Sequence, residues 1–368
     1  MKTGKSIVEL ANELQRIKDT AKDFIVPVEK LKMVTVEENG EIDTALSFQN
    51  GSVHEPKLSN WAHSQMSTFT NVPKAYYDRL KSEAPDLLAR NVNHGLDMVR
   101  FDAYARKKPA SRMIRTVDGK IRGLLSSRYR RLDSFDMAET ILPILSGNGF
   151  QVQSSEITER RLYIKAVTPK LETEVKKGDV VQFGLCVSNS DVGAGSAKIE
   201  PLIFRLVCLN GMISSTAIRK MHIGKDQAGD SIQELLSDQT KELSDAAFWA
   251  QVRDVVLASM RPEIFEREVD NLREASQQKI TNFDLEEVVE LSMDRVGVTG
   301  KETKKSIISY LANGADGAGL TKWGLANAFT FAAQADHVDY EQSTELERAG
   351  SRVIELPRKD WTRIAESV

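Results

Sequence analysis

The side chains best suited to chemistry in this sequence are the cations of residues 100–131, here called the basic block. It contains eleven Lys and Arg residues against only two carboxylates, Asp102 and Asp118. Its cations are Arg100, Arg106, Lys107, Lys108, Arg112, Arg115, Lys120, Arg122, Arg128, Arg130 and Arg131. Phe101, Tyr104 and Tyr129 are interleaved with them. Because cations attract phosphates and aromatic faces stack on bases, the block predicts a binding site for a single nucleic-acid strand.

The basic block also has a plainer interpretation, as a solvated strand face whose charges pair with acidic helices. Residues 225–300 carry eight Lys and Arg against seventeen Asp and Glu. Separate blocks of opposite sign indicate either an anionic partner or self-association between the blocks. We therefore expect a homo-oligomer. Alternation along an extended segment would place Arg128 and Arg130 on one side and Tyr129 and Arg131 on the other, so that these four could not all face one ligand.

The glycine-rich stretch DVGAGSAK, residues 191–198, lies between two strong strand patterns and predicts a mobile hairpin tip. Lys198 at its end could touch a nucleic-acid backbone. The stretch does not match a phosphate-binding loop, and neither does NGADGAG at 313–319. The five histidines have no metal-ligand spacing, and no nucleophile or carboxylate set for catalysis can be assembled. We therefore expect no catalytic residues, no metal and no cofactor.

Two features concern single buried residues. Cys186 and Cys208 lie in apolar strand-like runs and are predicted to be reduced core residues. In RLVCLNGMISS, Arg205 stands within an apolar run and requires either a core carboxylate or a phosphate as its partner. The sequence leaves both open. Asn210 and Gly211 predict a tight turn at the end of this strand.

The order of the elements predicts an α+β fold, with an antiparallel β-rich central domain, flanking helices and a helical C-terminal half. Residues 5–20 have apolar side chains at helical spacing. The expected regions are 1–95, an N-terminal helical and strand segment packed on the core; 96–224, a β-rich basic core; 225–340, an acidic helical region; and 341–368, a polar tail. No apolar run approaches the roughly 18 residues of a membrane span. We expect a cytoplasmic protein without membrane contact.

Three segments together carry a family resemblance. They are TVDGKIRGLLSSRYRRLDSFDMAETILPIL, PLIFRLVCLNGMISS and LTKWGLANAFTFAAQADHVD. They resemble the phage/plasmid-like protein family known as domain of unknown function 932, over roughly residues 95–340, and RLVCLNGM is the most specific of these matches. The resemblance implies an origin in a mobile element and supplies no catalytic residues. The order of helix, hairpins and helices is also similar to that of phage single-strand annealing proteins, by architecture alone.

These observations lead to two hypotheses of different class. The first is a phage or plasmid protein that binds single-stranded DNA through the basic block, in strand annealing or recombination, without a cofactor. The alternative is an interaction or anti-defence protein whose basic block docks an acidic host protein. Binding that weakens steeply with salt would favour the first, since phosphate contacts release counterions.

Overall fold

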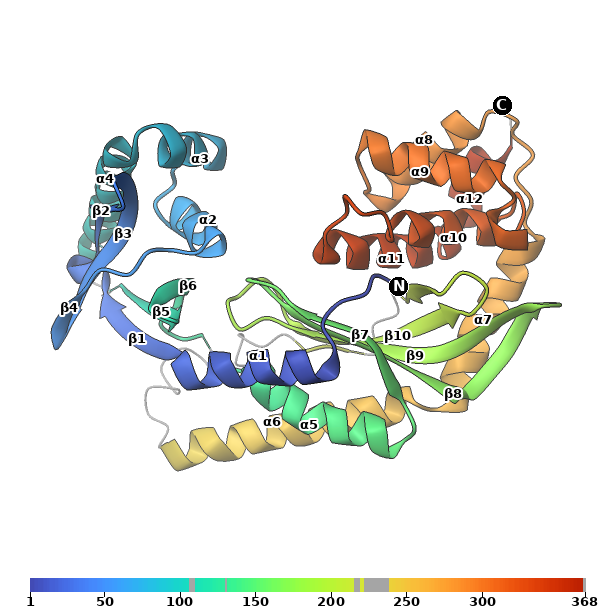
Figure 1. Cartoon of the computed structure of the whole chain (residues 1–368), viewed down its shortest axis with the longest axis horizontal. Coiled ribbons are helices and arrows are strands. Elements are labelled where there is room, and N and C mark those ends of the chain that lie inside the picture. Colours follow the sequence, from blue (N-terminus) through green and yellow to red (C-terminus); the bar gives the residue numbers. More distant parts are fainter. Residues whose placement is uncertain (106–109, 130, 215–218, 222–237, 367–368) are drawn as a thin grey trace.

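A computed structural model describes the chain apart from residues 106–109, 130, 215–218, 222–237 and 367–368. The chain forms an N-terminal lobe, residues 22–126, and a larger body that contains the first helix and the rest of the chain (Figure 1). The lobe and the C-terminal helices stand at opposite ends of the body's sheet and on the same side of it. The molecule therefore has the outline of a U.

Helix α1 (Ile7–Thr20) confirms the helix expected at residues 5–20. Ser6 and Glu9 form a capping box, in which the Ser6 side chain accepts from the Glu9 backbone and the Glu9 carboxylate accepts from the Ser6 backbone. Leu10 and Leu14 are buried on the face of α1 that packs against the body. The first helix thus belongs to the body, although the lobe follows it in sequence.

The N-terminal lobe is built from two small antiparallel sheets and three helices. One sheet has the strand order β1-β5-β6 and the other β2-β3-β4. Its elements are β1 (Lys22–Pro27), β2 (Lys32–Glu38), β3 (Glu41–Asn50), β4 (Ser52–His54), α2 (Asn60–Phe69), α3 (Lys74–Glu83), α4 (Pro85–Ala105), β5 (Ser111–Val117) and β6 (Lys120–Ser126), with a 3-10 turn at Val28–Lys30. Buried side chains from both sheets and all three helices form a separate core.

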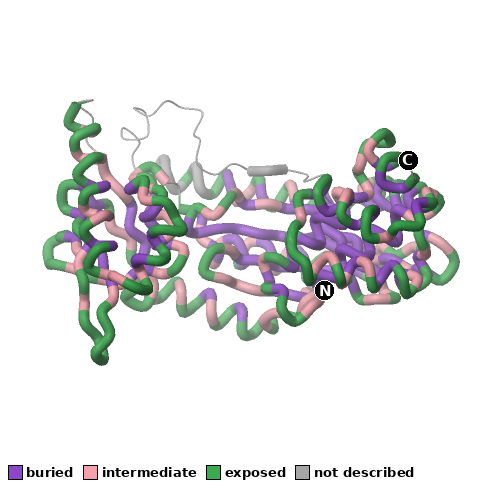
Figure 2. Tube along the Cα trace, turned by 90° about the horizontal axis from the view of Figure 1, so that it is seen from above, coloured by how far each residue is buried: buried purple, intermediate pink, exposed green. Residues whose placement is uncertain are grey.

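The body is built around one larger antiparallel sheet of order β11-β10-β9-β8-β7, with β12 also paired to β10. Its strands are β7 (Gln151–Ile157), β8 (Leu162–Lys176), β9 (Asp179–Asn189), β10 (Ala197–Arg205), β11 (Asn210–Ile213) and β12 (Arg219–Met221). Figure 2 shows that buried residues concentrate along these central strands. Helices α5 (Ser134–Gly147) and α6 (Asp238–Ser259) lie below this sheet, as viewed in Figure 1.

The helical C-terminal half is confirmed. Above the sheet lie α8 (Leu285–Val296), α9 (Lys301–Ala312), α10 (Lys322–Ala332), α11 (Tyr340–Ile354) and α12 (Arg358–Ala365), and α7 (Pro262–Gln277) leads up to them (Figure 1). The glycine-rich break forms a 3-10 turn at Ala315–Gly317. Among the described residues, no helix is long and apolar enough to cross a membrane.

The structure divides the chain differently from the regions expected. β1 pairs with β5, and β5 with β6, so the lobe extends to residue 126 rather than ending near 95. Residues 341–368, expected to be a polar tail, contain most of α11 and all of α12. Their apolar side chains Leu346, Val353 and Trp361 are buried in the body's core. The segment looked polar because its helices also bury charged residues in ion pairs, such as Arg348 with Glu200.

The partner of the buried Arg205 is a carboxylate. Its Nε donates to Asp179 Oδ1 at 2.6 Å, and its Nη2 donates to Oδ2 at 3.1 Å. Trp323 Nε1 donates to the same Oδ2 at 2.9 Å. The turn after β10 consists of residues 206–209, and Asn210 begins β11, so the turn expected at Asn210 and Gly211 was misplaced. Cys186 is buried as expected, whereas Cys208, in that turn, is only partly buried.

Candidate nucleic-acid interface

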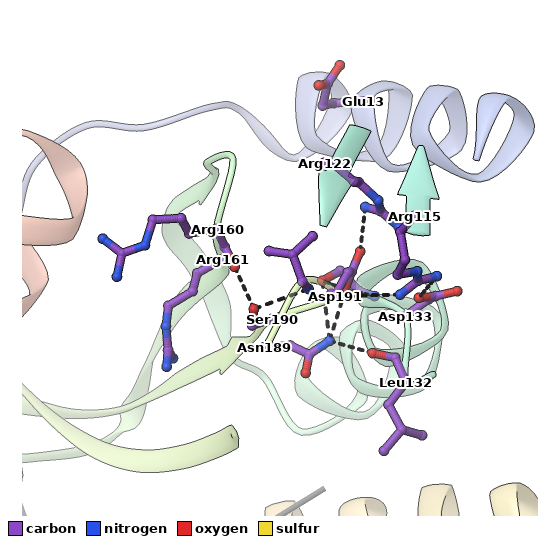
Figure 3. Close-up of polar contacts among 12 residues, drawn as sticks. Glu13, Arg115, Arg122, Leu132, Asp133, Arg160, Arg161, Asn189, Ser190 and Asp191 are labelled. Atoms are coloured by element: carbon purple, nitrogen blue, oxygen red, sulfur yellow. Dashed lines mark hydrogen bonds and ion pairs between the residues drawn. The ribbon is translucent and has the colours of Figure 1, made fainter. Parts of the chain in front are cut away.

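Asp191, in the loop between β9 and β10, joins the lobe to the body. Its Oδ1 accepts hydrogen bonds from the backbone and hydroxyl of Ser134, at 2.8 and 2.6 Å. Its Oδ2 accepts from Arg122 at 3.1 Å, and its carbonyl accepts from Arg115 at 2.8 Å (Figure 3). The Asp133 side chain makes no capping bond to α5. Asp191, in the loop between β9 and β10, therefore accepts a hydrogen bond from a free backbone N–H at the start of α5, as a capping side chain would.

Among the described cations of the basic block, Arg115 is the most deeply buried, with 1% of its side chain exposed. Its Nε lies 2.9 Å from Asp23 Oδ1, and its Nη2 lies 2.7 Å from Asp133 Oδ1. Burial opposes ionisation of the guanidinium, but Asp133 and Asp23 outweigh it and raise the Arg115 pKa. Burial raises the pKa of Asp133, against the opposing effect of Arg115. Arg115 is thus a structural ion-pair partner.

The loop of residues 190–196 is bonded to both parts of the molecule. Tyr129 donates its hydroxyl to the Ser190 carbonyl at 2.9 Å, and burial raises the Tyr129 pKa to about 12. Trp61 Nε1 donates to the Val192 carbonyl at 2.9 Å. Arg161 donates to the Ala194 carbonyl through Nη2 at 2.6 Å. The loop does connect two antiparallel strands, but these contacts hold it against α2 and the turn that joins β7 to β8, where a mobile hairpin tip was expected.

The structure brings only part of the predicted site together. Arg115, Arg122 and Tyr129 meet around Asp191, and Arg131 pairs with Asp23 at 3.3 Å while its side chain stays 59% exposed. Lys120 and Arg128 are exposed near them in sequence. The chain here also differs from the expected extended segment, because β6 ends at Ser126 and a turn follows at residues 127–128. Strand alternation therefore does not apply to Arg128 and Tyr129.

Other predicted residues lie apart from this group. Arg100 on α4 donates to the Val28 and Leu31 carbonyls. Arg112 lies over the Phe69 ring, 3.9 Å from its centroid. Lys198 on β10 is 4.0 Å from Glu200 Oε1. The remaining predicted residues, Arg106, Lys107, Lys108 and Arg130, lie outside the described residues.

A pocket of about 250 Å³ lies between α1, the β5–β6 hairpin and the turn joining β7 to β8. Five basic residues contribute to its lining: Arg16, Lys120, Arg122, Arg160 and Arg161. Three of these five lie outside the basic block. Sequence reasoning missed them because nothing in one sequence shows that α1 and the turn at residues 158–161 pack beside β6. The adjacent Arg160 and Arg161, between two strand patterns, were the only local signal.

The β7–β8 turn touches both arms of the U. The Arg160 guanidinium lies 4.6 Å from the centroid of the Trp61 ring in the lobe and 3.0 Å from Glu341 Oε2 on α11. Glu159 Oε2 accepts from the Trp61 backbone at 3.1 Å. In Figure 3 the side chains of Arg160 and Arg161 extend away from Arg115 and Arg122. The side chains of Arg160 and Arg161 therefore lie on one side of this turn, and those of Arg115 and Arg122 lie on the other.

Two of the three aromatic residues of the basic block, Phe101 and Tyr104, are exposed on α4. Phe101 is 65% exposed and Tyr104 is 85% exposed, and Met98 beside them is also exposed. Helical spacing places these three side chains on neighbouring positions of the helix surface. In the described part of the chain, no group of three or more His, Cys, Asp or Glu residues could hold a metal ion. The exposed groups are thus suited to contacts with anions and flat rings.

Fold and site together define an α+β protein in which a small lobe is joined to a sheet-based body through a buried charged junction. The family model described as Domain of unknown function (DUF932) matches residues 122–353, and the chain belongs to that family. Its matched segments meet in the structure. Arg122 donates to Asp191 and Tyr129 donates to Ser190, and Arg205 contacts α10 through Asp179 and Trp323. No curated protein and no solved structure matches the chain.

Proposed function

We propose that this protein binds single-stranded nucleic acid at the junction between lobe and body, in a mobile-element process such as strand annealing or recombination. One observation carries the proposal: folding adds Arg16, Arg160 and Arg161, from distant segments, to Lys120 and Arg122 around one pocket. A strand needs such a concentration of cations because its phosphates supply most of the binding free energy.

The cations divide into two groups by exposure. Arg115 and Arg122 are largely buried and bound to Asp23, Asp133 and Asp191, so they shape the junction. Lys120 is exposed. Arg131 and Arg160, 59% and 46% exposed, each keep a large solvent-accessible surface despite an ion pair. Exposed ion pairs are weak, so a phosphate can compete for these cations. We therefore assign phosphate contact to Lys120, Arg131 and Arg160.

The test is a salt-titrated binding assay with single-stranded DNA, duplex DNA and RNA. The triple variant Lys120→Ala, Arg131→Ala, Arg160→Ala should bind the preferred strand more weakly. Its slope of log affinity against log salt should fall by about 0.7 for each phosphate that the variant no longer neutralises. Arg79→Ala, Arg90→Ala is the matched control, because both arginines are highly exposed on α3 and α4.

Unchanged affinity and slope in a folded triple variant would refute the proposal. If the unaltered protein binds none of the three nucleic acids, docking of an acidic protein becomes the better explanation of the basic block. An equal loss in the control pair would show that total charge, rather than the junction, determines binding.

A further inference from the structure

The pocket at the junction has mainly apolar walls. Its partly exposed apolar lining comes from Ile17 of α1, Val117 of the β5–β6 hairpin and Ile157 at the end of β7. The other apolar lining residues are almost fully buried. Its volume of about 250 Å³ corresponds to about eight waters at liquid density, which leaves room for a single small ring. Apolar walls suit the faces of a flat ring.

The polar groups of the pocket disfavour a bare phosphate as its occupant. Glu13, Glu159 and Asp191 are all part of the lining and repel an anion held inside. Arg16 is already bound by Glu13, with its Nη2 2.7 Å from Oε1, and by Asp118. A neutral ring inside the pocket is not repelled by these carboxylates. Its phosphate, at the mouth, does not have to displace the partners of Arg16.

One donor in the lining lacks a partner. Arg122 donates through Nη1 to Asp191, but its buried Nε has no acceptor among the described residues. A buried N–H without an acceptor is costly, so a ligand that offers an acceptor there gains binding free energy. Ring nitrogens and carbonyl oxygens of nucleobases are such acceptors. Ser134, which also lines the pocket, already donates its hydroxyl to Asp191.

From the walls, the carboxylates and this donor, we propose that the pocket receives one unstacked nucleobase. The inference rests on the proposed function and deepens it. The base packs against Ile17, Val117 and Ile157 and accepts a hydrogen bond from Arg122 Nε. Lys120 and Arg160 meet the flanking phosphates. Insertion of a single base adds a contact to a base edge, which backbone contacts alone do not provide.

Filling the pocket without changing any charge tests this inference. Ile17→Trp places an indole at the pocket wall, and Val8→Trp, on the exposed side of the same helix, is the matched control. A hydrogen bond to a charged group typically contributes about tenfold to a hundredfold in affinity, and a base kept out of the pocket loses the bond from Arg122 Nε. Ile17→Trp should weaken single-strand binding by that factor and leave the salt slope unchanged, because every cation that meets a phosphate is still in place. Val117→Trp fills the pocket from β5 if Ile17→Trp does not fold.

Saturation-transfer NMR with thymidine monophosphate and deoxyribose 5-phosphate gives an independent measurement. Base protons should receive saturation from the unaltered protein and from Val8→Trp, but not from Ile17→Trp, and the sugar phosphate alone should show no transfer. Strand binding that is unaffected by a folded pocket-filling variant would overturn the inference while the proposed function stands. Base saturation that disappears in Ile17→Trp, without any strand binding, would sustain the pocket and reject the proposed function. If neither strand binding nor saturation of the base is detected, both the pocket inference and the proposed function are rejected.

Discussion

The ion pair of Arg205 illustrates how a single buried residue can be anticipated and yet left undecided by sequence. An arginine within an apolar strand has to have an anionic partner, and that much followed from RLVCLNGM alone. Which anion it was depended on Asp179, which begins the neighbouring strand and faces Arg205 only after β9 and β10 pair. Local residue patterns do not show which strands pair with each other.

Loss of this carboxylate should strongly destabilise the body. Asp179→Asn leaves Arg205 with an uncompensated buried charge and weakens the bond from Trp323. Breaking a buried ion pair typically costs about 3–5 kcal/mol in the free energy of unfolding. Urea unfolding measures the difference, with Asp97→Asn as the control, since Asp97 makes an exposed pair with Arg100. Equal stability of the two variants would contradict the assignment.

His63 should make the lobe sensitive to acid. Burial lowers its pKa to about 4, from about 6.5 in the unfolded chain, and its Nδ1 lies 2.9 Å from the Tyr77 hydroxyl. Below pH 6.5 the unfolded chain takes up a proton that the folded lobe refuses, so stability falls as pH falls towards 4. We expect this residue to contribute a loss of about 2 kcal/mol between pH 7 and pH 5. Unfolding of His63→Gln at both pH values should show a correspondingly smaller loss.

At the scale of elements, periodicity predicted most helices and strands, because each has one face in a core. α1 and the C-terminal helices were found in this way, and so were the strand patterns on either side of Arg160. What could not be predicted was which elements meet. β1, at the start of the lobe's sequence, pairs with β5 near its end, and α1 packs beside β7. The junction depends on those contacts, so Asp23, Asp191 and Arg160 were not identified beforehand as site residues.

Helix α4 carries a prediction of its own, because its exposed rings can stack on bases without adding charge. The double variant Phe101→Ala, Tyr104→Ala should weaken single-strand binding about fivefold or more. The salt slope should stay the same, unlike that of the Lys120, Arg131, Arg160 variant. Fluorescence anisotropy at several salt concentrations measures both quantities. Full affinity in this variant would limit the interface to the junction.

At the scale of the whole molecule, the opposite charges of residues 100–131 and 225–300 still predict self-association. The structure moderates this expectation, because Asp23, Asp133 and Asp191 already pair with Arg115, Arg122 and Arg131 within one chain. We expect oligomers at low ionic strength that become smaller from about 0.1 to about 0.5 M salt, where the Debye length falls from about 10 Å to about 4–5 Å. Light scattering across this range measures the molar mass, and a monomer mass at every salt concentration would contradict self-association.

The placement of α1 has a consequence for the order in which the chain acquires its structure during synthesis. All strands of the lobe lie within residues 22–126, so the lobe can complete its own core before the body exists. Leu10 and Leu14 of α1 pack in a core whose other members begin at residue 132. Domains generally form as units from the N-terminus. Helix α1, which leaves the ribosome ahead of both units, therefore keeps its apolar face without a partner until the second, larger unit has emerged behind an already folded first one.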